Sequence, residues 1–240
     1  MNTIEVCLTP KLFDEIMTKE NYIVVMVDIL RASTSICAAF ENGVKEIIPV
    51  ATIEQAKEYK SKGFLVASER DGKVLDFADF GNSAFNFMNE EVKGKTIVYS
   101  TTNGTQAIDL AKHAKGLAIG AFNNLSVLAD YLIKENKNLV ILCAGWKNKF
   151  NLEDTIFAGA LIERLLLNNN FKMDCDAAEA SLDLWLTAKK DPLAYIEKAA
   201  HRHRLKRLKL DDVLEYTFKN DSTNVVPVLK GNVLIDALKE

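Results

Sequence analysis

One run of six residues constrains this chain more than any other feature. Residues 22–27 read Tyr-Ile-Val-Val-Met-Val, rich in β-branched side chains and free of charge. Such a run is typical of a central strand that is covered on both faces, as the strands of parallel sheets are. Asp28 follows directly, and an acid in that place is partly desolvated and needs a partner. The run therefore predicts a buried strand that carries an acid at its carboxyl end.

Strand and helix patterns alternate around this run over about 165 residues. The expected strands lie at 4–8, 22–27, 45–50, 64–68, 96–99, 117–121 and 139–143. The expected helices lie at 11–18, 29–43, 52–63, 83–90, 106–111, 126–135 and 151–167. Thr52 and Gln55 have the spacing of a capping box at the start of one helix. This alternation predicts an α/β fold, a three-layer αβα sandwich with a mostly parallel or mixed sheet.

The pattern changes in the last third of the chain. Helix signals begin at Asp176 and at Asp191, and the basic run 201–209 falls inside or just after the second of these helices. With a further helix signal at 211–219 they predict a helical C-terminal part, and 225–229 with 233–235 predict a closing hairpin. There is no internal sequence repeat, low-complexity segment or linker, so we expect a single domain over residues 1–240. A structural duplication whose sequence has diverged stays open.

Charge and composition exclude several classes of protein. Thirty basic residues against 33 acidic ones give a net charge of −3, so no overall field attracts nucleic acid. No apolar run approaches the roughly 20 residues of a membrane span, and no signal peptide is recognisable. The four cysteines lack the paired spacing of metal sites, which favours reduced thiols in a cytoplasmic protein.

Polar side chains gather where the expected strands end. Four such junctions stand out: 28–35, Glu69 with Arg70, 100–105, and 143–145 followed by Glu153 and Asp154. In a parallel sheet every strand points the same way, so we expect all four junctions along one edge, where α/β proteins bind ligands.

The junction at 100–105 reads Ser-Thr-Thr-Asn-Gly-Thr between a strand and a helix. A helix start offers unpaired N–H groups and a partial positive charge, and here hydroxyls and an amide surround it. This combination can wrap a phosphate. A polar turn that only caps the helix is an equally good interpretation.

The charged residues of the junctions have two interpretations each. The guanidinium groups of Arg31 and Arg70 can each donate two hydrogen bonds to an oxyanion, or they can pair with acidic residues on the surface. Asp28, Glu153 and Asp154 are hard oxygen donors of the kind that Mg²⁺ requires, although acids in a first helical turn are also favoured by the helix dipole. The spacings of several known phosphatase motifs, of the Walker loop and of the dinucleotide fingerprint are absent.

The motifs together resemble those of the 2-phosphosulfolactate phosphatase (ComB) family. The resemblance rests on segments 27–35, 69–70, 79–83, 100–105, 143–145 and 152–155, with His201, Arg204 and 225–227 near the C-terminus. It implies a Mg²⁺-dependent phosphatase, acting as a homodimer, that converts 2-phospho-3-sulfolactate to 3-sulfolactate and phosphate. In methanogens that step belongs to coenzyme M biosynthesis. The chain departs from the family pattern at 73–75, Ala84 and 146–149, and two of these segments border the expected pocket.

The residues expected in the site fall into three groups. The catalytic candidates are Asp28, Arg31, Glu69 and Arg70. The substrate-binding candidates are Ser33, Ser35, Asn82, Ser100, Thr101, Thr102, Asn103, Gly104, Thr105, Cys143 and Gly145. The metal candidates are Asp28, Glu153 and Asp154.

The sequence leaves the attacking group open, with water, Asp28, Cys37 and Cys143 as alternatives. His201 can protonate a leaving group, but its place in a basic helix favours a solvated face. Two other functions stay open beside the first. They are hydrolysis of another phosphorylated 2-hydroxy acid, and anion binding without catalysis.

Overall fold

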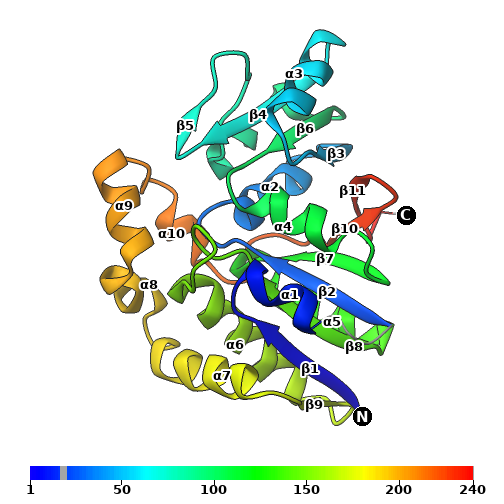
Figure 1. Cartoon of the computed structure of the whole chain (residues 1–240), viewed down its shortest axis with the longest axis vertical. Coiled ribbons are helices and arrows are strands. Elements are labelled where there is room, and N and C mark those ends of the chain that lie inside the picture. Colours follow the sequence, from blue (N-terminus) through cyan, green and yellow to red (C-terminus); the bar gives the residue numbers. More distant parts are fainter. Residues whose placement is uncertain (17–20, 240) are drawn as a thin grey trace.

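The computed structural model describes residues 1–16 and 21–239 (Figure 1). Its strands are β1 (Asn2–Cys7), β2 (Tyr22–Val27), β3 (Glu46–Pro49), β4 (Leu65–Arg70), β5 (Lys73–Val74), β6 (Thr96–Ser100), β7 (Gly116–Gly120), β8 (Asn138–Cys143), β9 (Phe171–Met173), β10 (Pro227–Lys230) and β11 (Val233–Asp236). Its α-helices are α1 (Phe13–Ile16), α2 (Ala32–Glu41), α3 (Ile53–Ser61), α4 (Gly104–Ala111), α5 (Leu125–Glu135), α6 (Leu152–Leu166), α7 (Asp176–Ala188), α8 (Pro192–Tyr195), α9 (Ala200–Leu208) and α10 (Leu214–Thr217). The fold is α/β, and its helices and large mixed sheet fit a three-layer sandwich, as the alternation predicts.

The sheet consists of two parallel parts joined by a hairpin. Across the described residues its strand order is β5-β4-β6-β3-β11-β10-β7-β2-β8-β1-β9. Strands β3, β4 and β6 pair in parallel, and so do β7, β2, β8, β1 and β9. The hairpin β10–β11 lies between the two parts and pairs antiparallel with both of them. Strand β2 has a parallel neighbour on each side and is buried along its whole length, which confirms its predicted central place.

The expectation that every strand points the same way is wrong. Three antiparallel ladders separate β3 from β7, so the two parallel parts run in opposite senses along the sheet. The hairpin touches each part through one residue pair, Val228 with Ala118 and Leu234 with Ile47. Such short ladders leave room for the strong twist of an open sheet. The strand ends meet because the two parts face each other, and α4, which follows β6, packs against β2 of the other part.

Most predicted elements are present, and four helices differ. The helix expected from Asp191 is limited to α8, which the 3₁₀ turn Ile196–Lys198 follows before α9 begins. The helix expected at 83–90 is instead two 3₁₀ turns, Ala84–Phe87 and Glu90–Val92. The helix expected at 211–219 is limited to α10. The helix expected at 11–18 consists of the 3₁₀ turn Pro10–Leu12 and α1, and residues 17 and 18 lie outside the described part. The capping box of Thr52 and Gln55 is confirmed at the start of α3.

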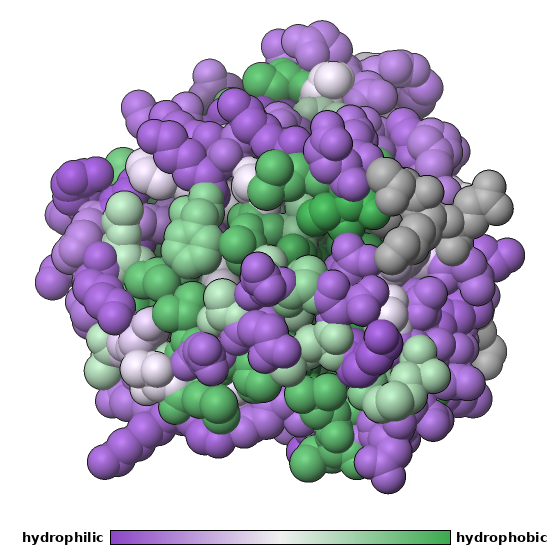
Figure 2. All heavy atoms as spheres, turned by 60° about the horizontal axis from the view of Figure 1, so that its bottom comes forward, coloured by the Kyte–Doolittle hydropathy of each residue, from purple (hydrophilic) through white to green (hydrophobic). Residues whose placement is uncertain are grey.

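The core follows the sheet and the helices packed on it. One large cluster of buried apolar side chains includes all of β2 and most of β8, and a smaller one lies between α3 and the strands β4 and β6. Figure 2 shows the face at the bottom of Figure 1, where apolar side chains gather between polar ones. None of the helices described here is long and apolar enough to cross a membrane.

Candidate functional site

Asp28 stands at the carboxyl end of β2, where the chain turns sharply into α2. Its N–H donates to Oγ of Ser33 at 2.7 Å, and the Ser33 N–H donates back to the Asp28 carbonyl at 2.9 Å. The side chain is 4% exposed. Burial raises the pKa of Asp28 to about 6, with His201 acting against this shift and the charges of Glu69 and Glu153 adding to it. The four ionisable groups therefore share one small region.

Glu69 and Arg70 hold the ends of β4 and β6 together. Oε1 of Glu69 accepts hydrogen bonds from the N–H and the hydroxyl of Thr102 at 2.9 and 3.0 Å, and Oε2 accepts from the Gly72 N–H at 2.7 Å. The Arg70 guanidinium donates to the carbonyl and the hydroxyl of Ser100 at 3.1 and 2.9 Å. Both side chains thus shape the loop at 100–105 from its outer side.

The 100–105 loop is closed by its own hydroxyls. The Thr101 N–H donates to Oγ1 of Thr105 at 3.0 Å, and the Thr105 N–H donates to Oγ1 of Thr101 at 3.2 Å. These two threonines are buried. Thr102 and Asn103 instead line a cavity beside Asp28. The start of α4 comes very close to Asp28, because a Cβ on Gly104 would lie 2.6 Å from Cβ of Ala32 and 3.0 Å from Oδ2 of Asp28.

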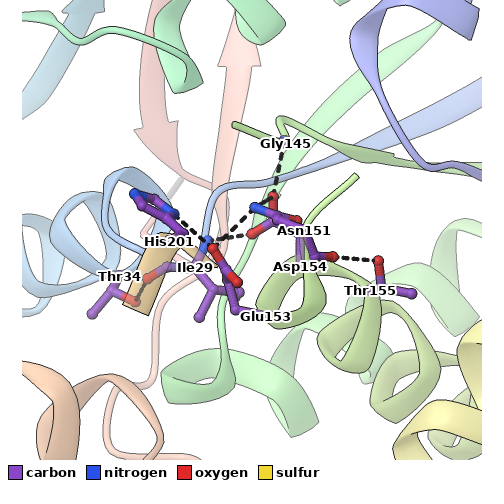
Figure 3. Close-up of polar contacts among 8 residues, drawn as sticks. All are labelled: Ile29, Thr34, Gly145, Asn151, Glu153, Asp154, Thr155 and His201. Atoms are coloured by element: carbon purple, nitrogen blue, oxygen red, sulfur yellow. Dashed lines mark hydrogen bonds and ion pairs between the residues drawn. The ribbon is translucent and has the colours of Figure 1, made fainter. Parts of the chain in front are cut away.

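Asp154 ties together the turns that follow β2 and β8. Its Oδ1 accepts from the Ile29 N–H at 2.8 Å, and its Oδ2 accepts from the Gly145 N–H at 3.1 Å and the Asn151 amide at 2.9 Å (Figure 3). Burial and the charges of Glu153 and Asp28 raise the pKa of Asp154 well above its usual value. Asn151 occupies the N-cap position of α6, as expected, but its amide donates to carboxylates instead of accepting from the helix.

Glu153 faces helix α9 at the same place. Its Oε1 lies 2.7 Å from Nδ1 of His201, and the two side chains are 0% and 5% exposed. Figure 3 shows the imidazole directed at the first turn of α6. Within the described part of the chain, Oε2 of Glu153 and Oδ1 of Asn151 are buried without a hydrogen-bond partner. Buried polar atoms are rarely left so, and these two oxygens are therefore free to contact a bound ion or water.

The remaining predicted residues divide between the cavity and its support. Arg31 and Asn82 line the cavity, and the Asn82 side chain accepts a hydrogen bond from the Tyr99 hydroxyl. Ser35 is fully buried, and its hydroxyl bonds to the Asn82 carbonyl at 3.3 Å. Cys143 is also fully buried, and burial raises the pKa of its thiol well above the usual value. A protonated, enclosed thiol is a poor nucleophile.

The cavity itself is narrow. Its walls are Asp28, Leu30, Arg31, Glu69, Gly72, Asn82, Thr102, Asn103, Trp146, His201, Arg204 and Leu205. They come from the ends of β2, β4, β6 and β8, from the loop at Asn82 and from α9, so six segments of the chain meet at one place. The volume is about 20 Å³, which is enough for about one water molecule.

Comparison with known proteins identifies the family of this chain. The sequence model described as 2-phosphosulpholactate phosphatase matches residues 7–232. The chain belongs to this family. A protein of Caldanaerobacter subterraneus subsp. tengcongensis named "Probable 2-phosphosulfolactate phosphatase" is 35% identical over 88% of this chain and 89% of its own length. Proteins of the same name from Thermotoga maritima and Clostridium beijerinckii are 35% and 34% identical over 90% and 88% of this chain, and over 92% and 90% of their own lengths.

Membership of a phosphatase family agrees with the predicted class, a phosphoric monoester hydrolase. The structure corrects one expectation about its residues. His201 does not lie on a solvated face, because it is buried against Glu153 and lines the cavity. Arg202 is also buried and pairs with Glu197 and Asp211. The many basic residues of this segment favour an exposed helix. The helical period nevertheless turns His201 and Arg202, in the first turn of α9, toward the interior of the protein.

Sequence reasoning placed the segment 146–149 at the border of the expected pocket but gave Trp146 no role. Its indole ring stacks on the His201 imidazole with centroids 5.7 Å apart and planes 4° from parallel. The available signal was the bulky, basic character of this segment directly after the fourth junction. Arg204, which the family resemblance includes, also lines the cavity, and Gly72 and Leu205 are further wall residues that no motif pointed to.

The donors fit a magnesium ion in part. Among residues 1–16 and 21–239, no group of three or more His, Cys, Asp and Glu side chains could hold a metal ion. Magnesium, however, is usually bound by one or two carboxylates together with water and substrate phosphate. Asp28 and the unpartnered oxygen of Glu153 meet that smaller requirement, whereas both oxygens of Asp154 already accept hydrogen bonds.

Proposed function

We propose that this protein is a Mg²⁺-dependent phosphatase that hydrolyses 2-phospho-3-sulfolactate to 3-sulfolactate and phosphate. The observation that carries the proposal is the meeting of Asp28, Arg31 and His201 in one cavity beside the start of α4, with Glu153 in contact with His201 from behind. The names of the relatives support this substrate, and the charged residues around the cavity support hydrolysis of a phosphoester.

The chain offers two kinds of group to the phosphate. The start of α4 lies next to Asp28 and presents N–H groups with a partial positive charge. Arg31 is 6% exposed, and its guanidinium can hold two oxyanions at once. Burial lowers the pKa of Arg31, and the negative charge of the nearby Glu69 acts against this shift, as the charge of a bound anionic substrate would.

Mg²⁺, held by Asp28 and Glu153, would supply charge neutralisation at the phosphoryl oxygens. Asp154 acts by position, since it fixes the backbone at Ile29 and Gly145 on either side of these two acids. The expected metal role of Asp154 thereby becomes one of orientation in this proposal.

His201 is the proposed proton donor to the leaving oxygen. Nδ1 faces Oε1 of Glu153, so this carboxylate fixes the ring and keeps a proton on Nδ1. Nε2 then remains for the substrate in the cavity that His201 lines. Water attacks phosphorus in line, and the buried thiols of Cys37 and Cys143 take no part, because burial raises the pKa of both.

Phosphate release from 2-phospho-3-sulfolactate, with and without EDTA, tests the proposal. We expect turnover that needs Mg²⁺, and its loss in Asp28→Asn, with an unchanged circular dichroism spectrum. A parallel assay with 2-phospholactate, which lacks the sulfonate, tests the second substrate class. Activity of Asp28→Asn within a few-fold of the wild type would remove Asp28 from the reaction.

The proposal includes a small phosphoester as the partner of the site, a homodimer and a cytoplasmic location. The homodimer follows from the family resemblance alone. Light scattering of the purified protein on a sizing column tests it, and a mass of 26.8 kDa would mean a monomer.

A further inference from the structure

Two cavities lie on either side of one aromatic pair. The cavity at Asp28 has a volume of about 20 Å³, which is far too small for a substrate with three anionic groups. A second cavity of about 190 Å³ lies between the start of α6 and the start of α9, where Phe150 and Lys198 are among its walls. Trp146 and His201 line both cavities and stack on each other. The structure leaves too little room for the whole substrate at Asp28, so we expect part of this wall to move when the substrate binds.

His201 is the fixed member of the pair. It is buried, and its Nδ1 lies 2.7 Å from Oε1 of the fully buried Glu153. Parting such a pair leaves an uncompensated buried charge and makes the open state rarer by a factor of about 10²–10⁴. Movement of the start of α9 is therefore an unfavourable way to open the wall.

Trp146 is held far more weakly. It is half-buried, and its contacts are the His201 stack and two cations near its ring, with Lys147 at 5.7 Å and Arg204 at 5.8 Å from the centroid. Parting an aromatic stack makes the open state rarer by about tenfold or less. Because Trp146 is held more weakly than His201, we expect Trp146 to move when the wall opens.

The backbone beneath Trp146 is rigid. The N–H and carbonyl groups of Trp146 and Lys149 exchange hydrogen bonds at 3.0 and 3.1 Å, and Lys147 and Asn148 between them have φ angles of 53° and 56°. These are the features of a tight two-residue turn. At Gly145, a Cβ would lie 2.4 Å from the Lys149 carbonyl oxygen, so the two ends of the turn lie too close together for any side chain at this position. Only the indole side chain is free to swing.

We propose that the Trp146 side chain is a gate between the two cavities. Swung away from His201, it joins them into one chamber that encloses the substrate, and swung back it covers His201 and excludes water. Lys198 in the second cavity offers a positive charge to the end of the substrate that is distant from the phosphate. The inference rests on the proposed phosphatase function and adds a specificity-determining residue to it.

The fluorescence of Trp146 tests the gate directly. The chain has two tryptophans, and Trp185 is buried under α6 with its indole N–H donating to Glu163 at 2.6 Å, outside both cavities. In a Trp185→Phe protein, Trp146 is therefore the one remaining indole. With saturating 3-sulfolactate and Mg²⁺, we expect its quenching constant for acrylamide to change by about threefold or more. An unchanged constant, in a sample that turns over 2-phospho-3-sulfolactate, would overturn the gate but leave the phosphatase proposal standing.

Trp146→Ala and Trp146→Phe give a second measurement that does not need Trp185→Phe. The alanine variant has no gate to open, so we expect its KM to fall by up to about tenfold while kcat also falls, because the closed state no longer competes with binding. Phenylalanine keeps a stacking ring and should restore both constants. A rise in KM for the alanine variant would make Trp146 a binding contact and overturn the gate. Absence of turnover by the wild-type protein would refute the proposed function, and the gate with it.

Discussion

Replacing Gly104 with alanine tests whether the start of α4 must lie against Asp28. The added Cβ would meet Cβ of Ala32 at 2.6 Å and Oδ2 of Asp28 at 3.0 Å. Carbon atoms in contact are normally about 3.5–4.0 Å apart, so α4 and α2 must separate by roughly 1 Å. Gly104 does not have a positive φ angle, and the change therefore introduces no backbone strain.

The sign of the change in stability shows whether helix propensity or the close contact at Gly104 dominates. Helix propensity alone favours alanine over glycine by about 0.8–1.0 kcal/mol, so without the close contact Gly104→Ala would stabilise the protein. Overpacking costs about 1–3 kcal/mol, so we expect a net loss of stability or no gain. A displacement of about 1 Å in a catalytic site can lower the rate about 10²-fold, and we expect a fall in kcat/KM of that order.

Steady-state phosphate release and urea unfolding of the same samples measure both quantities. The matched control is the double variant Ala32→Gly with Gly104→Ala, which moves the methyl group from α2 to α4. It relieves the closest contact and should recover much of the lost kcat/KM, although the contact with Asp28 remains. Gly104→Ala with wild-type kcat/KM and raised stability would refute the reasoning, as would failure of Ala32→Gly to improve the activity of Gly104→Ala.

Three further predictions concern single side chains. Arg31→Lys keeps the charge but loses the forked contact, and we expect kcat/KM to fall by the equivalent of about 2–4 kcal/mol; an unchanged value would make Arg31 structural. Cys143 should resist alkylation by iodoacetamide at pH 7 in the folded protein, because burial raises its pKa, and labelling detected there by mass spectrometry would contradict the full burial of this thiol. Burial alone would raise the pKa of Asp79, but hydrogen bonds from Lys60 and Val66 outweigh it and the pKa is lowered. Asp79 therefore stabilises the fold above pH 4 and loses that contribution as the pH falls further, so Asp79→Asn should lower the urea midpoint at pH 7 and have little effect at pH 3.

Local patterns predicted the elements of the site better than their arrangement. The apolar run ending at Asp28 and the hydroxyl-rich turn at 100–105 are both at strand ends, and both border the cavity. The sequence does not show which of the hydroxyls at 100–105 face the cavity. Thr101 and Thr105 bond to each other, whereas Thr102 points toward Glu69 and the cavity, and only the backbone path decides between them.

The two larger errors have physical causes. The hairpin at residues 227–236 inserts between strands from distant parts of the chain, and no local pattern reveals such an insertion. His201 belongs to a helix with many cations, and its burial depends on Glu153, which lies 48 positions earlier in the sequence. Pairings over such distances are set by tertiary packing, which single-residue propensities do not describe.

The C-terminal hairpin has a consequence for the order in which the protein folds. It follows the other strands in the sequence, so a ribosome delivers β10 and β11 after both parts of the sheet that they join. Until then, the edges of β3 and β7 are open to pairing with other chains, which is a hazard for nascent proteins. The cavity is built from both parts, so activity should emerge from a translating ribosome only after β10 and β11 have been made.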